Sequence, residues 1–311
     1  RAYVLVGDDR QFFPERKLQT ISYSIEETYQ GLYQQLRRHL GRPKMPQTPN
    51  GLLSSETLTY ARYGLWHFVY PDKQDDSPYS DLQRAGANLR GLMRILLFKR
   101  FESSVHAFRE TARRLLRIHR HFLLALDQGI VPAGEEAQDL LYESDQDEEQ
   151  VLMDALAEVS GRYKAQDFDV VALRSCIEHD IQILGKMLSL VYPITPGEDD
   201  KLQTLKHWLK KPALCEGKCL IFTQYADTAA YLYRQLDPND DRPEIEVIYS
   251  GDKSRANVVG RFAPDANPQH QPPPGVPQID ILVATDVLAE GLNLQDCDKV
   301  INYDLHWNPV R

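Results

Sequence analysis

Three short polar clusters in the C-terminal third of the chain carry groups suited to holding a phosphate. They are Thr223-Gln224, Ser250-Gly251 and Thr285-Asp286, and each directly follows an apolar run that predicts a buried β-strand. Hydroxyl, amide and backbone N–H groups at a strand end can hydrogen-bond a phosphate without reading a base sequence. Glycine, at 251 and again at 291, allows a backbone to approach a ligand closely. The sequence therefore predicts a phosphate-binding edge.

Purely structural interpretations of some of these residues stay open. Gly251 also fits a turn that needs a glycine, and Asp286 also fits the N-cap of a helix. His119, His121 and Cys176 do not have the spacing of a metal site, so we expect no bound metal there.

Two motifs that ATP hydrolysis uses are missing from the sequence. No Gly-x-x-x-x-Gly-Lys-Ser/Thr loop occurs, and residues 251–254 (Gly-Asp-Lys-Ser) have Asp where that loop needs Gly before Lys. No Asp-Glu-x-His sequence for magnesium occurs either. We therefore expect this chain by itself not to hydrolyse ATP.

The polar clusters lie in a segment where strand and helix patterns alternate. Strands are predicted at 218–223, 245–249, 279–284 and 300–303, and helices at 227–236 and 255–262. This alternation predicts an α/β fold with a parallel sheet, in which ligands bind beyond the carboxyl ends of the strands.

The preceding part of the chain reads as helical. Residues 1–15 are predicted to be a linker and 17–25 a strand, after which Ser24 and Glu27 form a capping box for a helix. Residues 41–55, with three prolines and two glycines, predict a loop. Helices are then expected over 56–69, 82–126, 148–160, 167–190 and 198–210.

Charge is unevenly distributed within this helical part. Residues 84–120 contain ten Arg or Lys and two acidic residues, whereas residues 134–150 contain eight acidic residues and no Arg or Lys. The basic stretch could face DNA, with Arg113 and Arg117 as candidate contacts, or it could be a solvated face that pairs with the acidic segment. Both interpretations stay open.

Residues 285–295 (Thr-Asp-Val-Leu-Ala-Glu-Gly-Leu-Asn-Leu-Gln) resemble the fifth motif of superfamily-two helicase-like motors. The resemblance is closest to the Swi/Snf-type double-stranded DNA translocases and their bacterial HepA-type relatives. Residues 218–225 resemble the fourth motif of this family, residues 249–262 its "G…R…RF" segment, and residues 300–309 its approach to the sixth motif.

The resemblance implies a C-terminal RecA-like domain at 198–311, a helical insertion at 41–197, and a linker with the start of the second motor lobe at 1–40. It further implies that Gln224, Gly251 and Thr285 face the tracked DNA strand. Gly291 and Asn293 would approach the nucleotide. ATP and magnesium would be held mainly by a first RecA-like domain, expected upstream of Arg1, and the sixth motif would begin at the end of this chain.

Composition limits the remaining possibilities. The 311 residues carry a formal net charge of −9, which argues against indiscriminate coating of nucleic acid. Four scattered cysteines favour a reducing, cytoplasmic setting, and no apolar run is long enough to span a membrane. Within the family, recycling of RNA polymerase and phage defence are alternative tasks. A different alternative is a non-catalytic protein-docking scaffold, against which the intact Thr285, Gly291 and Asn293 count.

Overall fold

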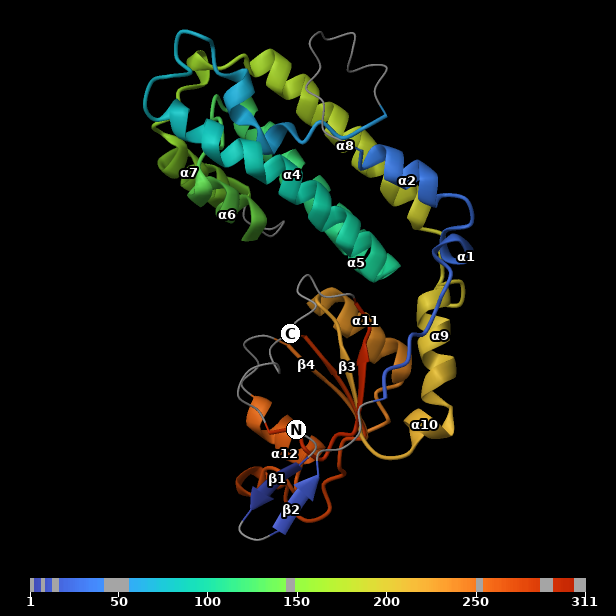
Figure 1. Cartoon of the computed structure of the whole chain (residues 1–311). Helices are drawn as coiled ribbons and strands as arrows, with labels where there is room; N and C mark the ends of the chain where they lie inside the picture. Colours follow the sequence, from blue (N-terminus) through green and yellow to red (C-terminus); the bar gives the residue numbers. More distant parts are fainter. Residues whose placement is uncertain are drawn as a thin grey trace.

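The computed structural model describes residues 3–6, 9–12, 17–41, 56–143, 149–249, 254–285 and 293–304. Figure 1 shows a group of helices above a smaller unit built around a sheet. The sheet unit contains α9 (Asp200–Leu209), α10 (Pro212–Cys215), β3 (Cys219–Phe222), α11 (Ala226–Leu236), β4 (Ile245–Ile248), α12 (Arg255–Phe262), a 3-10 turn (Pro268–His270), β5 (Ile281–Ala284) and β6 (Lys299–Asn302).

The four strands of this unit form a parallel sheet in the order β4-β5-β3-β6. Alternate strand residues are buried on opposite faces, as a pleated strand with two covered faces requires. Ile221 and Val283 pack against α9 and α11, whereas Leu220 and Leu282 pack against α12. The sheet is therefore a RecA-like α/β domain with helices on both faces, as predicted.

The helical region contains seven α-helices within the described residues. They are α1 (Ile25–Tyr29), α2 (Tyr33–His39), α4 (Tyr79–Ser103), α5 (Val105–Asp127), α6 (Glu135–Glu143), α7 (Glu149–Ser160) and α8 (Val170–Val191). Short 3-10 turns at Ala61–Tyr63, Leu65–Phe68 and Ala165–Asp167 connect them.

Helix α5 is the centre of this region, because α4 and α8 both pack along it. Its apolar residues recur at three- and four-residue steps, which aligns them on the buried faces of the helix. Phe108 belongs to a core near the sheet unit, and Phe122 belongs to a second core at the far end. Tyr29 and Leu36, from the first helices, join the core near the sheet unit.

The long helical pattern expected over 82–126 is interrupted at a single residue. Ser104 has extended backbone angles (φ −158, ψ 152) and lies between α4 and α5. Its hydroxyl accepts a hydrogen bond from the backbone N–H of Ala107 at 3.0 Å, so it is the N-cap of α5. Apolar periodicity predicts both helices but not the corner between them, because the apolar pattern continues without a break through Ser104.

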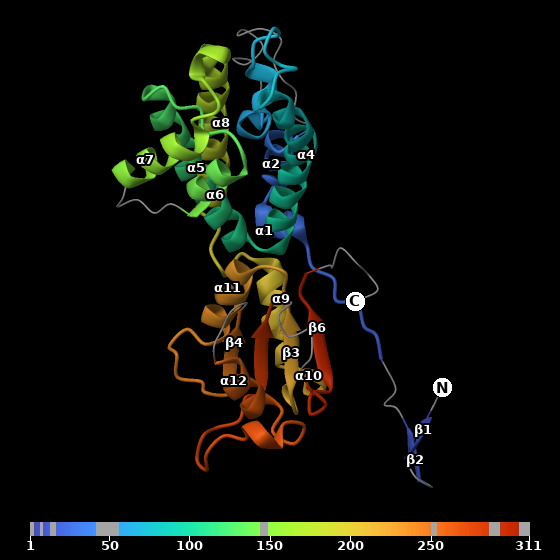
Figure 2. The same cartoon turned by 90° about the vertical axis from the view of Figure 1, so that its left-hand side faces the viewer.

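Several other local predictions are wrong. Residues 3–6 and 9–12 are not a plain linker, because β1 (Tyr3–Val6) and β2 (Asp9–Phe12) pair as antiparallel strands, and Figure 2 shows them standing apart from the sheet. The strand expected at 17–25 does not form. No described strand pairs with it, and the N–H of Ser24 instead donates to Asp200 at 2.6 Å.

The helix expected over 56–69 is replaced by two 3-10 turns on either side of Gly64. Backbone N–H groups of Thr59 and Ala61 bind the Asp180 carboxylate instead of helix carbonyls. The helices expected at 148–160, 167–190 and 198–210 and all four strands of the parallel sheet are confirmed to within a few residues. The domain boundaries at 41 and 198 stay predictions. Among the described helices, none is long and apolar enough to cross a membrane.

Candidate functional site

The four parallel strands end level with one another. Phe222 pairs with Ala284 on one side and with Asn302 on the other, and Ala284 also pairs with Ile248. The next residue of each strand therefore lies in one row along the carboxyl edge of the sheet, in the order Tyr249, Thr285, Thr223 and Tyr303. This row is the edge at which the sequence predicted phosphate binding.

Thr223 and Thr285 are neighbours in this row, and both continue the strand face that packs on α9 and α11. Backbone hydrogen bonds extend past the strand ends, because Thr223 N donates to Ala284 O at 3.0 Å and Thr285 N donates to Ile248 O at 3.4 Å. Thr285 is 6% exposed, and its hydroxyl has no hydrogen-bond partner among the described residues. Leaving a buried hydroxyl without a hydrogen bond costs about 1–3 kcal/mol of stability. We therefore expect this hydroxyl to bind a further partner.

The hydroxyl of Thr223 differs from that of Thr285, because it donates to Asp304 Oδ2 at 2.5 Å. Asp304 follows β6 and is 8% exposed. The same oxygen accepts the backbone N–H of Gln224 at 3.0 Å and the hydroxyl of Ser103 at 2.9 Å. The loop after β3 is thus fixed by a carboxylate from the neighbouring strand.

Lys201 of α9 is the cationic partner of this carboxylate. Its Nζ donates to Asp304 Oδ1 at 3.1 Å, and to the backbone oxygens of Glu102 at 3.1 Å and Ser103 at 2.9 Å. All three ammonium protons therefore have acceptors, as a buried charge requires. Burial lowers the pKa of Lys201, and the adjacent Asp304 carboxylate opposes that effect.

Tyr225, which follows Gln224, is covered by a side chain from the helical region. The guanidinium of Arg100 lies 4.2 Å from the centre of the Tyr225 ring and forms an ion pair with Asp227 of α11. Arg100, a residue of the basic stretch, therefore binds the sheet unit.

A comparison with known protein families adds to this geometry. Residues 200–311 match the model of the helicase conserved C-terminal domain, and the matched segment contains all four parallel strands. We name residues 200–311 the helicase C-terminal domain after this match.

Three relatives of this helicase C-terminal domain show the range of similarity. The uncharacterized ATP-dependent helicase YqhH of Bacillus subtilis is 56% identical over 98 residues, which is 31% of this chain and 15% of that protein. The ATP-dependent RNA helicase DBP8 of Kluyveromyces lactis is 26% identical over 186 residues, covering 60% and 38%. The ATP-dependent RNA helicase RhlB of Shewanella sp. ANA-3 is 27% identical over 110 residues, covering 35% and 22%. The chain thus spans less than two fifths of each of these relatives.

Asn293 lies at the opposite end of the helicase C-terminal domain from the row of strand ends. Its Nδ2 donates to Ala266 O at 3.3 Å, just after α12, which runs back towards the amino ends of the strands. Its Oδ1 accepts the N–H of Gln295 at 3.4 Å. The structure therefore does not bring Asn293 together with Gln224 and Thr285. Gly251 and Gly291 lie outside the described residues.

The two arginines proposed from the basic stretch lie on α5. Arg113 is exposed and pairs with Glu110 one turn earlier, and Arg117 is partly buried. Other members of the stretch bind protein groups. Arg109 donates to Val191 O at 3.0 and 2.6 Å, and Arg94 donates to Leu40 O at 3.1 Å. These two arginines therefore bind the carbonyl groups at the ends of other helices.

Among the described residues, no group of three or more His, Cys, Asp or Glu residues could hold a metal ion. Asn293 also uses its side chain on neighbouring backbone. A cavity of about 10 Å³, roughly the space of one water molecule, lies inside the helical region between α4, α5 and α8.

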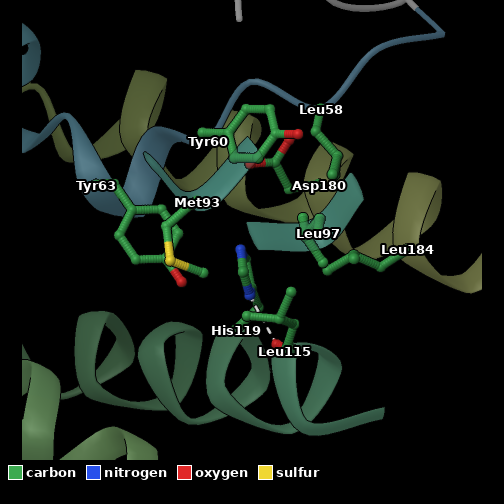
Figure 3. A pocket seen from close by; sticks show the side chains of 9 residues that line it. All are labelled: Leu58, Tyr60, Tyr63, Met93, Leu97, Leu115, His119, Asp180 and Leu184. Atoms are coloured by element: carbon green, nitrogen blue, oxygen red, sulfur yellow. Dashed lines mark hydrogen bonds between the residues drawn. The ribbon is translucent and has the colours of Figure 1, made fainter. Parts of the chain in front are cut away.

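Two titratable side chains line that cavity. Figure 3 shows the His119 imidazole pointing from α5 into the space below Met93 and Leu97, with Asp180 and Tyr60 beyond. Burial lowers the pKa of His119 to about 3, so the ring is neutral, and its Nδ1 donates to Leu115 O at 2.7 Å. Burial raises the pKa of Asp180 to about 7. Their position within the helical core indicates a structural role.

Sequence reasoning missed the residues that join the two parts. The sequence predicted Lys201 only as part of the helix at 198–210 and Asp304 only as part of the motif at 300–309, and it gave no sign of a role for Ser103. An acidic residue directly after the strand predicted at 300–303 was an available signal for Asp304, because a carboxylate buried at the edge of a sheet needs strong donors. The spacing of about a hundred residues between each of the three gives no local pattern that would connect them.

Proposed function

We propose that this chain is the C-terminal half of an ATP-dependent, DNA-tracking motor of the Swi/Snf type. In this proposal the carboxyl edge of the sheet grips the phosphate backbone of double-stranded DNA. A first RecA-like domain of the same polypeptide holds most of the ATP and magnesium, and this chain completes that site. One observation carries the proposal: the buried Thr285 hydroxyl has no described partner and lies beside Thr223 at a level row of strand ends.

The chain's own residues would act on the backbone by hydrogen bonding alone. The Thr285 hydroxyl would donate to a phosphate oxygen, and the Gln224 side chain, held in place by the Asp304 bond to its backbone, would contact the same strand. Such contacts position a protein on nucleic acid without specifying a sequence, as a tracking motor requires. Gly251 and Gly291, with Asn293, complete the proposed DNA and nucleotide contacts.

Double-stranded DNA is the polymer we favour. The motif order resembles that of the Swi/Snf-type translocases of double-stranded DNA. RNA is the second candidate, because DBP8 and RhlB are named RNA helicases. Arg113 and Arg117 would add phosphate contacts, each contributing about 0.9 to the salt dependence of binding.

The test compares Thr285→Ala with Thr204→Ala, a partly exposed threonine on α9, in the complete natural polypeptide. ATP turnover is measured with duplex DNA, single-stranded DNA and RNA. A hydrogen bond to a charged group contributes about 1.5–3 kcal/mol. Thr285→Ala should therefore raise the nucleic-acid concentration for half-maximal stimulation of ATP turnover roughly tenfold or more. Thr204→Ala should match the wild type.

The outcomes separate the candidates. Stimulation by RNA but not by duplex DNA would replace the DNA proposal with the RNA candidate. Unchanged stimulation in Thr285→Ala would remove that residue from the grip. A complete polypeptide without any ATP turnover would favour the scaffold alternative, with a protein partner on the helical region.

A cytoplasmic location is part of the proposal and is supported by the four free cysteines.

A further inference from the structure

The corner between α4 and α5 is joined to the carboxyl edge of the sheet by a buried polar cluster, which we name the Asp304 junction. It is formed by Ser103, Ser104, Lys201, Thr223, Thr228 and Asp304. All six residues are at most 9% exposed. Figure 1 shows the end of α4 and the start of α5 meeting the sheet unit beside α11.

The Asp304 carboxylate accepts donors from separate elements. Oδ2 accepts the hydroxyl of Ser103 at 2.9 Å, the hydroxyl of Thr223 at 2.5 Å and the N–H of Gln224 at 3.0 Å. Oδ1 accepts the ammonium of Lys201 at 3.1 Å. The helical corner and the loop after β3 thus share one carboxylate oxygen, so a change in either set of bonds alters the other.

The hydroxyl groups of Ser104, Thr228 and Ser103 all donate their hydrogen bonds in the same direction, towards Asp304. Ser104 Oγ accepts the N–H of Ala107 and lies 3.0 Å from Thr228 Oγ1, to which it can donate. Thr228 Oγ1 lies 2.8 Å from Ser103 Oγ, which itself donates to Asp304. Each hydroxyl proton therefore points along the chain Ser104, Thr228, Ser103, Asp304. The N-cap of α5 is connected by hydrogen bonds to the carboxylate that holds Gln224.

The corner is also the place where the two long helices separate. Lys201 caps the last carbonyls of α4, and the extended Ser104 starts α5. A change in the angle between α4 and α5 would move Ser103 relative to Asp304. Because a buried carboxylate must keep its donors, the bonds to Thr223 and Gln224 would have to adjust.

We propose that Asp304 is a positioning residue that couples the α4–α5 corner, through Ser103, to the backbone of Gln224 at the nucleic-acid-facing edge. The proposal rests on the proposed function for the identity of that edge. It assigns the helical region a role in setting the grip on the polymer. A partner or a DNA segment that moves α4 and α5 would change the position of Gln224.

The first test is hydrogen exchange in the complete natural polypeptide carrying Ser103→Ala. This variant removes the direct side-chain bond from the helical corner to Asp304 and keeps the Thr223, Gln224 and Lys201 bonds. Amide exchange of residues 222–226 should rise about threefold or more, although Ser103 is over a hundred residues away in sequence. The matched control is Ser189→Ala, whose hydroxyl binds only Gly185 O within α8. Exchange at 222–226 equal to that of the wild type would overturn the proposal.

A double-mutant comparison distinguishes coupling from simple loss of packing. In the Asp304→Asn background, Ser103→Ala should add no further change in exchange at 222–226, because both substitutions interrupt the same path. Fully additive effects would overturn the coupling. If Asp304→Asn does not fold, the single Ser103→Ala variant still decides.

The second test measures nucleic-acid stimulation of ATP turnover. Ser103→Ala should raise the duplex concentration for half-maximal stimulation about threefold, with unstimulated turnover unchanged. If the wild type is not stimulated by any nucleic acid, the proposed function fails, whereas the exchange experiment still tests the coupling. An exchange response without a change in half-maximal stimulation would overturn the role of the junction in the grip.

Discussion

The helical region and the helicase C-terminal domain each contain a deeply buried aspartate, and the two are held differently. Among the described residues, Asp180 of α8 accepts neutral donors from one short segment, including Thr59 N at 2.6 Å, Thr59 Oγ1 at 2.9 Å and Ala61 N at 3.4 Å. Asp304 accepts an ammonium and three neutral donors from three places in the chain. The first carboxylate fixes a local loop, and the second joins separate parts of the molecule.

The difference shows that a buried carboxylate can either join separate parts of the fold or fix the conformation of one loop. No cation donates a hydrogen bond to Asp180 among the described residues; burial raises the pKa of Asp180 to about 7, and its hydrogen bonds only partly offset this. With Lys201 beside it, Asp304 belongs to an ion pair whose members both depend on groups from the other part. Removing a partner should therefore have its largest effect at the junction.

The largest effect is expected from Lys201→Met. Removing the ammonium leaves the Asp304 carboxylate buried without a cation, so the free energy of unfolding should fall by about 3–5 kcal/mol. Urea denaturation measures this. Lys73→Met is the control, because Lys73 and Asp76 form an exposed pair at 3.7 Å that contributes about 0–1 kcal/mol. Equal losses in the two variants would show that the junction is not an essential ion pair.

A pH-dependent difference is expected at Asp180. A carboxyl whose pKa is higher in the folded state stabilises the fold at low pH and loses that contribution as pH rises from about 4 to about 7. The stability of the wild type relative to Asp180→Asn should therefore fall by about 3 kcal/mol between pH 4.5 and 7.5. His119, with the opposite dependence, is present in both proteins and cancels. A difference independent of pH, measured by urea denaturation, would contradict the assignment.

A smaller effect should distinguish two arginines of the basic stretch. Arg100 stacks on Tyr225 and pairs with Asp227, with side chains 20% and 23% exposed. Arg113 pairs with Glu110 at a more exposed place, at 46% and 32%. Arg100→Leu should lower the free energy of unfolding by about 1–2 kcal/mol, and Arg113→Leu by less than about 0.5 kcal/mol. The reverse order in thermal or urea unfolding would show that Arg113 has a structural partner.

The sequence predicted the sheet well because each element there carries its own local signal. Short apolar runs such as 219–222 and 281–284 are buried on both faces, and the helices between them have a regular apolar stripe. The row of strand ends followed from the parallel arrangement, and the structure brings Thr223 and Thr285 side by side. Gln224 joins them through its backbone bond to Asp304.

The N-terminal part was predicted less well, because distant groups decide its local structure. Ser24 caps α1 as expected, since Glu27 N donates to its hydroxyl at 3.1 Å, but Asp200 accepts the Ser24 N–H instead of Glu27. The backbone N–H groups of Thr59 and Ala61 donate to the Asp180 carboxylate instead of forming helical hydrogen bonds. Neither partner is near in sequence, so no window of local pattern contains the information.

The sequence alone determined the α/β character of residues 198–311, its helicase-like motifs and the helical nature of the preceding region, because these depend on periodicity and short spacing. The tertiary structure decided which polar residues meet: Ser103, Lys201 and Asp304 at the junction, and Asn293 at the far end from Thr285. Buried polar groups must find partners wherever the chain brings them. That requirement acts across the whole fold and leaves no periodic trace in the sequence.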